Sequence, residues 1–315
     1  MVTIKRHIDT LSRLAVLVVM FILLIVISPS FGTATNIFNV LRVSALTLMI
    51  ATGISLCMLV GGIDLSVGAT IALTSILFGR YFQIGRSTGE MFFGIAGILL
   101  LSVVIGAGNG FCVAYLGLPP FLATYGIQQI VRGLAYLLTN GMVYSGFTET
   151  FKFIGSGSIL GIHTPIIFAA VLLVAVGFML NKTTLGRRIY AVGSNRGSAR
   201  YSGINVNSTL MTAYILSSLI AGFAGVIYTS RLNCAEPTIG AEFAQQAIAA
   251  AAIGGISFKG GHGNVFSVTI GALMLTLITN GMTLLGIDSD WQVGATGVII
   301  ILAVLIDRNT AKKKV

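Results

Sequence analysis

The sequence predicts an all-α protein that crosses a membrane about ten times, and three observations lead to that prediction. Of its 315 residues, 55% are hydrophobic and only 9% are charged, whereas a soluble domain carries about 25% charged residues. The mean hydropathy is +0.95, and the apolar residues form continuous runs rather than the alternating pattern of a membrane β-barrel. The 39 glycines suit close helix–helix contacts and broken helices inside a bilayer. A soluble globular protein and a disordered chain are both excluded.

Ten apolar runs follow one another along the chain, and about 20 residues are needed to cross the hydrocarbon core. The eighth run is short, and the fourth is long enough to be tilted or kinked. No segment is long or polar enough to form a soluble domain, so residues 1–315 are expected to make a single transmembrane domain. The runs cover residues 11–28, 40–60, 65–80, 91–116, 121–139, 164–181, 208–229, 244–257, 264–286 and 292–306.

The charged residues set the expected orientation. No small-residue cleavage site follows the first run, so we expect an uncleaved span there rather than a secretory signal. If the N-terminus is cytoplasmic and the runs alternate in direction, most acidic residues fall outside and most basic residues fall inside. Cytoplasmic loops are enriched in Lys and Arg, so both termini are expected in the cytoplasm. The basic residues on that side are Lys5, Arg6, Arg13, Lys182, Arg187, Arg188, Arg196, Arg200, Lys259, Arg308, Lys312, Lys313 and Lys314. Because they are spread over loops, the net charge of +10 indicates topology and not a nucleic-acid surface.

A glycine-rich turn separates the second run from the third. Gly61 and Gly62 break the helix and permit a tight turn, so both are expected to act as hinges. Asp64 follows at a position from which its carboxylate could cap the next helix. Alternatively, a carboxylate at this depth lines a polar cavity or holds a moving joint, because it is costly in a membrane otherwise. The two interpretations are compatible.

The segment 182–207 is the largest internal basic loop. Ser194 or Asn195 can cap a short helix that runs to about Ser202, and Gly203 can end it. A solvated, positively charged loop is the simplest interpretation. However, Tyr190 and other apolar residues alternate with the basic ones, which favours a docking surface for another protein.

A second glycine-rich turn follows the small-residue run Ala249–Ile253. Gly254 and Gly255 are expected to act as hinges there. The turn lacks the Gly-Lys-Ser/Thr ending of a phosphate loop and follows no strand, so nucleotide binding is rejected. Like the first turn, it consists of an apolar run, Gly-Gly-Ile, and a turn into another apolar run. The similarity is too short to establish an internal repeat.

Six polar residues in or beside the apolar runs are candidates for a solute pathway. Amide groups both donate and accept hydrogen bonds, which suits a neutral, hydroxyl-rich solute. Hydrogen bonding between helices is the alternative role of such residues. The three cysteines and three histidines are scattered, so neither a metal site nor a cofactor nor a catalytic group is expected. The six candidates are Asp64, Asn109, Gln128, Gln245, Gln246 and Asn280.

Several of these stretches together resemble the permease subunit of bacterial ATP-binding-cassette (ABC) sugar importers of the ribose-type branch. Gly61–Gly68 is similar to that family's signature turn, and Tyr190–Asn195 followed by Ser202–Val206 is similar to its cytoplasmic coupling loop. Ala249–Gly263 resembles its Gly-Gly turn before the penultimate span, and Asn280–Gly286 also fits. The matches occur in the family's order over most of the chain.

The resemblance implies alternating access driven by a separate ATPase subunit, which docks inside the cell on a coupling loop. The chain itself is then a single permease domain and a transport subunit, not an enzyme. The resemblance also implies an external sugar-binding protein, a second permease copy in a homodimer or heterodimer, and a location in the bacterial inner membrane. The docking residues implied are Gly186, Arg187, Arg188, Asn195, Arg200, Ser202 and Gly203.

The sequence departs from the family pattern in one short segment. Where the family usually has Glu-Leu-Asp, this chain has Ala244-Gln245-Gln246. A ribose-like monosaccharide is the expected substrate, and a furanose signalling molecule is the alternative. An intramembrane enzyme would need clustered carboxylates or a Ser–His pair in the spans, which the nine dispersed acidic residues do not supply. A passive channel, which needs neither ATP nor a partner, is a further alternative.

Overall fold

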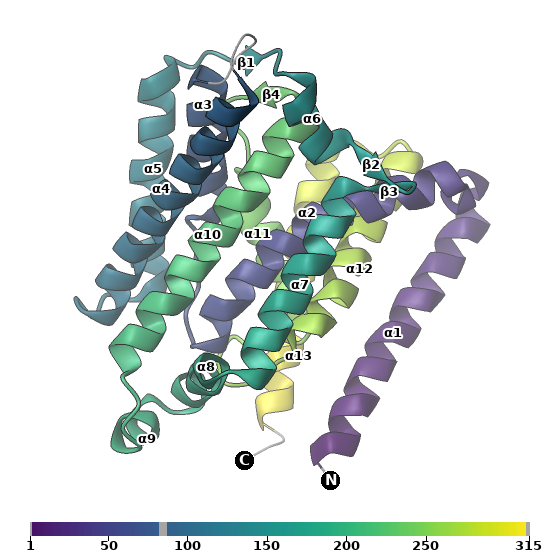
Figure 1. Ribbon diagram of the computed structural model, residues 1–315. Coiled ribbons are helices and arrows are strands. Elements are labelled where there is room, and N and C mark those ends of the chain that lie inside the picture. The colour runs from purple at the N-terminus through teal and green to yellow at the C-terminus, as the bar shows by residue number, and fades with distance from the viewer. Residues whose placement is uncertain (1, 82–86, 313–315) are drawn as a thin grey trace.

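The computed structural model describes residues 2–81 and 87–312, without the side chains of residues 2–9, 303 and 306–312. Several basic residues that set the expected orientation, such as Lys5, Lys313 and Lys314, therefore lie outside the described side chains. The described chain is a bundle of helices (Figure 1). Each expected apolar run falls on a helix. These ten helices are α1 (Val2–Ile27), α2 (Ala34–Leu59), α3 (Val67–Tyr81), α4 (Thr88–Ala114), α5 (Pro120–Thr139), α7 (Thr164–Lys182), α10 (Val206–Leu232), α11 (Phe243–Ile253), α12 (Val265–Leu284) and α13 (Ser289–Lys312).

The remaining elements are short and connect the long helices. They include four two-residue strands, which pair antiparallel as β1 with β4 and β2 with β3. Neither these strands nor α6 and α8 are among the expected elements. The connecting elements are η1 (Pro29–Gly32), α6 (Glu149–Ser156), α8 (Thr184–Ser194), α9 (Arg196–Tyr201), β1 (Tyr144–Ser145), β2 (Ser158–Ile159), β3 (Ile162–His163) and β4 (Cys234–Ala235).

Six of the helices in the described part of the chain are long and apolar enough to cross a membrane: α1, α2, α4, α7, α10 and α12. The expected number was about ten. Helices α3 and α11 have 15 and 11 residues, which at 1.5 Å per residue is shorter than the roughly 30 Å of the hydrocarbon core. Helix α5 carries Arg132, and in α13 the apolar segment covered by described side chains is Ser289–Leu302. The structure thus supports a polytopic all-α protein.

The bundle core is built around α2, which packs against α7, α10, α11 and α12. In the most apolar segment of α2, 78% of the residues are buried, whereas none of the α1 segment is buried. A helix that is apolar on all sides belongs in a core, so α2 is the centre of the bundle. Helix α1 stands at its edge with its apolar side chains exposed, as expected of a helix that faces lipid (Figure 1).

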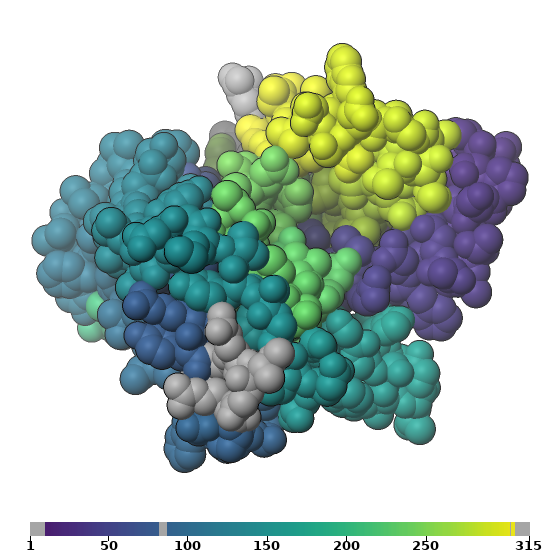
Figure 2. All heavy atoms as spheres, turned by 90° about the horizontal axis from the view of Figure 1, so that it is seen from above, coloured from purple at the N-terminus to yellow at the C-terminus, as the bar shows by residue number. Residues whose placement is uncertain are grey.

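The two ends of the bundle differ in content. Helices α8 and α9 lie at the same end as both chain termini, and α6 and the strands lie at the other end (Figure 1). Seen from the end that carries α6, the N-terminal segment and the C-terminal helices lie side by side on one edge (Figure 2), in agreement with the contact between α1 and α12.

The loop between β4 and α11 enters the bundle instead of lying across its end. Gly240 packs against Gly68 at the start of α3, so closely that a Cβ on Gly68 would overlap the Gly240 carbonyl oxygen. Arg132 of α5 donates hydrogen bonds to the carbonyl oxygens of Pro237 and Ile239. These bonds satisfy backbone groups that hydrocarbon cannot satisfy, which explains the basic residue on an apolar helix.

Glycines permit close packing between α4 and α10. A Cβ on Gly106 would lie 2.7 Å from the Ile215 Cα and 2.7 Å from the Tyr214 carbonyl oxygen. A Cβ on Gly110 would lie 2.9 Å from the Met211 Cα. Small residues spaced by one helical turn bring membrane helices into backbone contact, where dispersion forces replace the hydrophobic effect.

Replacing Gly106 with alanine is expected to lower the thermal stability of the purified protein, since overpacking of this kind costs about 1–3 kcal/mol. Gly97→Ala is the matched control, because Gly97 lies on the same helix and no described atom lies within 4 Å of its added Cβ. The melting temperature of each variant in detergent is measured by size-exclusion chromatography of heated samples. Equal melting temperatures for the two variants would contradict close packing at Gly106.

Candidate functional site

A buried carboxylate forms the centre of a polar cluster between α2, α3, α4 and α10. Asp64 Oδ1 accepts hydrogen bonds from the Ser66 backbone N–H at 3.0 Å and the Ser66 hydroxyl at 2.7 Å. Asp64 Oδ2 accepts from the Ser217 hydroxyl of α10 at 2.8 Å. Asn109 of α4 donates to the Ser66 Oγ at 2.7 Å. Asp64, Ser66, Asn109 and Ser217, which we call the Asp64 cluster, are all fully buried.

The turn before Asp64 is also attached to α5. The Thr124 hydroxyl donates to the Ile63 carbonyl oxygen at 3.2 Å and accepts from the Leu65 N–H at 3.2 Å. Asp64 itself bonds to Ser66, which directly precedes the first residue of α3, and not to N–H groups inside that helix. The Asp64 carboxylate therefore joins the turn to α10. A role of Asp64 in lining a solute pathway stays a prediction.

A cavity of about 260 Å³ lies between α2, α10 and α11 and has a mixed polar and apolar lining. We call it the Gln246 cavity. Gln246, Arg231, Tyr228 and Thr47 supply its polar groups. The Tyr228 and Phe243 rings meet edge to face, with their centroids 5.0 Å apart. The full lining is Val43, Leu46, Thr47, Ile50, Tyr228, Arg231, Phe243 and Gln246.

The predicted pathway residues do not come together in one place. Of the six, Gln246 lines this cavity, while Asp64 and Asn109 belong to the Asp64 cluster. Gln245 is exposed and Gln128 is half-buried on α5. Asn280 exchanges two hydrogen bonds with Asn36 of α2, at 3.0 and 3.1 Å, so its contact is interhelical.

Sequence reasoning overlooked Arg231, Tyr228 and Thr47. A signal for Arg231 was present, because an arginine directly after the run 208–229 is costly in a membrane unless it serves a function. No comparable signal marked Tyr228 or Thr47.

The basic loop folds as two consecutive helices. Thr183 caps α8 by accepting from the Gly186 N–H at 3.3 Å, and Asn195 caps α9 by accepting from the Ser198 N–H at 2.8 Å. Gly203 follows α9 with φ +78°. The expected short helix between Asn195 and Gly203 is therefore present, and α8 is an addition to it.

The predicted docking residues differ in their exposure to solvent. Gly186 is buried together with Ile189 and Val192, and these residues, three apart, form the face of α8 that packs on the bundle. The opposite face is solvent-exposed and basic, as expected of an amphipathic helix. The exposed docking residues are Arg187, Arg188, Asn195, Arg200, Ser202 and Gly203.

Helices α8 and α9 contact both turns that contain the predicted hinge glycines. Arg196 donates to the Val60 carbonyl oxygen at 3.4 Å, next to Gly61 and Gly62. Tyr190 donates to the Gly263 carbonyl oxygen at 3.0 Å, in the loop that begins at Gly254 and Gly255.

These two turns also contact each other. The Gly261 N–H donates to the Leu59 carbonyl oxygen at 2.8 Å. A Cβ on Gly193 of α8 would overlap that same oxygen. Gly61 and Gly255 have φ values of +74° and +85°, a conformation that favours glycine. The ends of α2 and α11 on the side of the chain termini therefore meet on α8.

The described residues contain no group of three or more His, Cys, Asp or Glu residues that could hold a metal ion. Cys234, in β4, is the cysteine outside the helices. Burial and, after it, the Glu236 carboxylate raise the pKa of its thiol. The thiol is therefore protonated near neutral pH, and it lacks the thiolate character of a reactive cysteine.

Residues 36–304 match a protein family described as a branched-chain amino acid transport system permease component. The chain belongs to this permease family. Among similar proteins, the ribose import permease protein RbsC of Escherichia coli is 39% identical over 94% of this chain and 92% of its own. The D-allose transport system permease protein AlsC of Escherichia coli is 38% identical over 91% of this chain and 87% of its own. The galactose/methyl galactoside import permease protein MglC of Haemophilus influenzae is 33% identical over 98% of both chains. No solved structure matches the chain.

Membership of this family makes the chain a transport permease of the ABC importer type and not an enzyme. Together with the long apolar helices, it makes the permease a multi-pass protein of the inner membrane. The resemblance seen in the sequence is confirmed.

Replacing Asp64 with alanine is expected to destabilise the permease, because it leaves the buried Ser66 and Ser217 hydroxyl groups without this hydrogen-bond partner, at a cost of about 1–3 kcal/mol per unsatisfied group. Ser217→Ala removes one of these bonds and should have a smaller effect. The double variant should be less destabilised than the sum of the two, because the residues are in contact. Melting temperature is the measurement, and Asp288→Ala, at an exposed carboxylate, is the control. Additive effects of Asp64→Ala and Ser217→Ala would contradict the bond between them.

Proposed function

We propose that this chain is the membrane-spanning subunit of an ABC importer for a monosaccharide, with residues 1–315 as one permease domain. The observation that carries the proposal is the set of relatives named for ribose, allose and galactose, which are 33–39% identical over nearly the full chain. In this proposal the ten apolar helices are membrane segments, α3 and α11 are the interrupted ones, and both termini are cytoplasmic. The placement of the basic helices α8 and α9 at the end with the termini supports that orientation.

The sugar is proposed to pass the Gln246 cavity. Arg231, Gln246, Tyr228 and Thr47 supply donors and acceptors for several hydroxyl groups, and Tyr228 and Phe243 supply rings for the apolar face of a sugar. Gln246 stands in the segment where related permeases usually have two carboxylates. Neutral amides there suit an uncharged solute and contribute to the choice among sugars.

The proposed driving partner is an ATPase subunit that docks on the exposed basic face of α8 and α9. From there, a push reaches Val60 through Arg196 and Gly263 through Tyr190. Both turns contain glycines that can change conformation, which fits alternating access by rocking of elements. A sugar-binding protein at the opposite end and a second permease copy, identical or related, complete the proposed assembly.

Gly203→Pro is expected to abolish uptake while the permease stays in the membrane. Proline fixes φ near −65° and lacks an N–H, whereas Gly203 has φ +78° and donates to the Arg200 carbonyl oxygen at 3.0 Å. Gly286→Pro is the matched control at the other end of the bundle, because Gly286 has φ +73° and donates to the Thr283 carbonyl oxygen at 3.0 Å. Uptake and co-purification of the ATPase subunit are measured. Normal uptake in Gly203→Pro would contradict the coupling role.

Gln246→Leu is expected to raise the half-saturating sugar concentration about 2- to 10-fold, from about 0.5–1.5 kcal/mol per lost hydrogen bond. Gln245→Leu, at the exposed neighbouring glutamine, is the control variant. Labelled ribose, allose, galactose, a furanose signalling molecule and leucine are tested with the complete importer. Uptake of leucine alone would contradict a sugar substrate, and uptake of the furanose alone would favour the alternative. Equal effects of the two glutamine variants would contradict passage through the cavity.

A further inference from the structure

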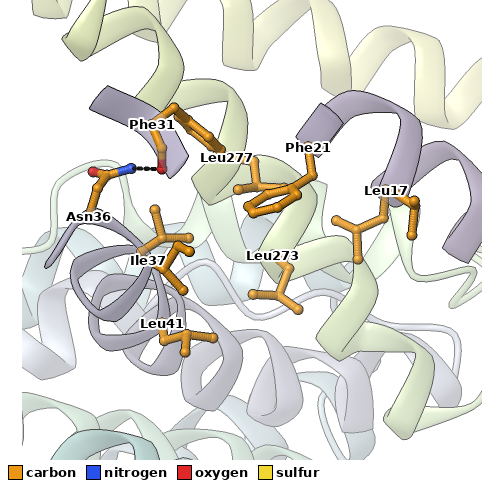
Figure 3. A pocket seen from close by; sticks show the side chains of 10 residues that line it. Leu17, Phe21, Phe31, Asn36, Ile37, Leu41, Leu273 and Leu277 are labelled. Carbon is orange, nitrogen blue, oxygen red and sulfur yellow. Dashed lines mark hydrogen bonds between the residues drawn. The ribbon is translucent and has the colours of Figure 1, made fainter. Parts of the chain in front are cut away.

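A second cavity, of about 190 Å³, lies between the peripheral helix α1 and the bundle (Figure 3). Side chains from α1, η1, α2 and α12 surround it, and Phe21, Ile37, Leu273 and Leu277 point toward a common space (Figure 3). We call it the apolar groove. Its lining is Leu17, Val18, Phe21, Phe31, Asn36, Ile37, Val40, Leu41, Leu273 and Leu277.

Helix α1 contacts the bundle on both sides of this groove. Toward the inner end, Arg13 donates to the Gly254 carbonyl oxygen at 3.0 Å. Toward the outer end, Leu24 lies against Gly281, where a Cβ would meet the leucine at 2.6 Å. Leu17 and Phe21 lie between these two contacts in the sequence. The gap is therefore bounded along α1 by these two contacts with the bundle.

The groove offers no binding site for water. Asn36 is the one polar residue among the ten that line it. Its amide donates to the Phe31 carbonyl oxygen at 3.1 Å (Figure 3) and exchanges hydrogen bonds with Asn280. Buried water needs two to four polar partners, so water is disfavoured there, and an apolar occupant would recover the lost dispersion contacts.

The groove opens toward lipid. Val18 and Leu41 at its rim are 49% and 36% exposed, and both stand on helices long and apolar enough to cross the membrane. In a bilayer the molecules beside such a rim are lipid chains. We propose that the apolar groove binds an acyl chain of a membrane lipid, which packs between α1 and the bundle.

The test uses the whole permease in vesicles of phosphatidylethanolamine and phosphatidylglycerol with a trace of phospholipid that carries a diazirine in mid-chain. After irradiation, mass spectrometry locates the attached lipid. We expect attachment to concentrate on residues 17–21, 37–41 and 273–277. Attachment spread evenly over all lipid-facing helices would overturn the proposal.

Filling the groove tests the same site a second way. Leu273→Trp and Ile37→Trp place a larger side chain in it, and each should reduce attachment there several-fold. Leu100→Trp is the matched control, because Leu100 is exposed on α4 and lies outside the groove. Unchanged attachment in both groove variants, each eluting as folded protein, would overturn the proposal. If both variants elute as aggregates, the map of lipid attachment on the unaltered permease tests the proposal by itself.

Discussion

Hydrocarbon supplies no hydrogen-bond partners, and this constraint governs each place where the chain leaves a helix inside the bundle. Between α2 and α3 the chain leaves helical structure, and Asp64, Ser66, Ser217 and Thr124 provide the hydrogen-bond partners that water would provide elsewhere. Between β4 and α11 the arginine of α5 does the same for two carbonyl groups. Both breaks lie against neighbouring helices, which supply the hydrogen-bond partners that hydrocarbon cannot. The interrupted helices α3 and α11 can therefore exist without loss of the fold.

Backbone packing also shapes the end of the bundle that carries the chain termini. There the turns after α2 and α11 are packed backbone to backbone, since glycines leave no side chain between them. Helix α8 lies on both turns, so its position fixes the separation of the two. Side chains of ordinary size at Gly193 or Gly261 would force the three segments apart. The glycine-rich backbone of both turns therefore lies directly against α8, on which the proposed ATPase subunit docks.

Local signals in the sequence predicted much of this arrangement. The ten apolar runs fall on helices, and Asn195 and Gly203 bound a short helix, because capping and left-handed glycine depend on neighbours in the sequence. Helix α8 was missed although Gly186, Ile189 and Val192 carry its spacing. The apolar runs did not predict which helices are buried inside the bundle. The α1 segment is more apolar than the α2 segment, yet α2 is the buried one. The pairing of Asn36 with Asn280 could not be foreseen, since 244 residues separate them.

The hydrogen bond from Arg13 to Gly254 has a significance beyond holding a helix at the edge. It attaches the peripheral helix α1 to the carbonyl group of a predicted hinge glycine. Any rotation of that peptide changes the direction of its carbonyl, and α1 must follow or release it. If Gly254 acts as the proposed hinge, α1 reports its movement. A spectroscopic label on the exposed surface of α1 would then register the proposed transport cycle without altering the Gln246 cavity or helices α8 and α9.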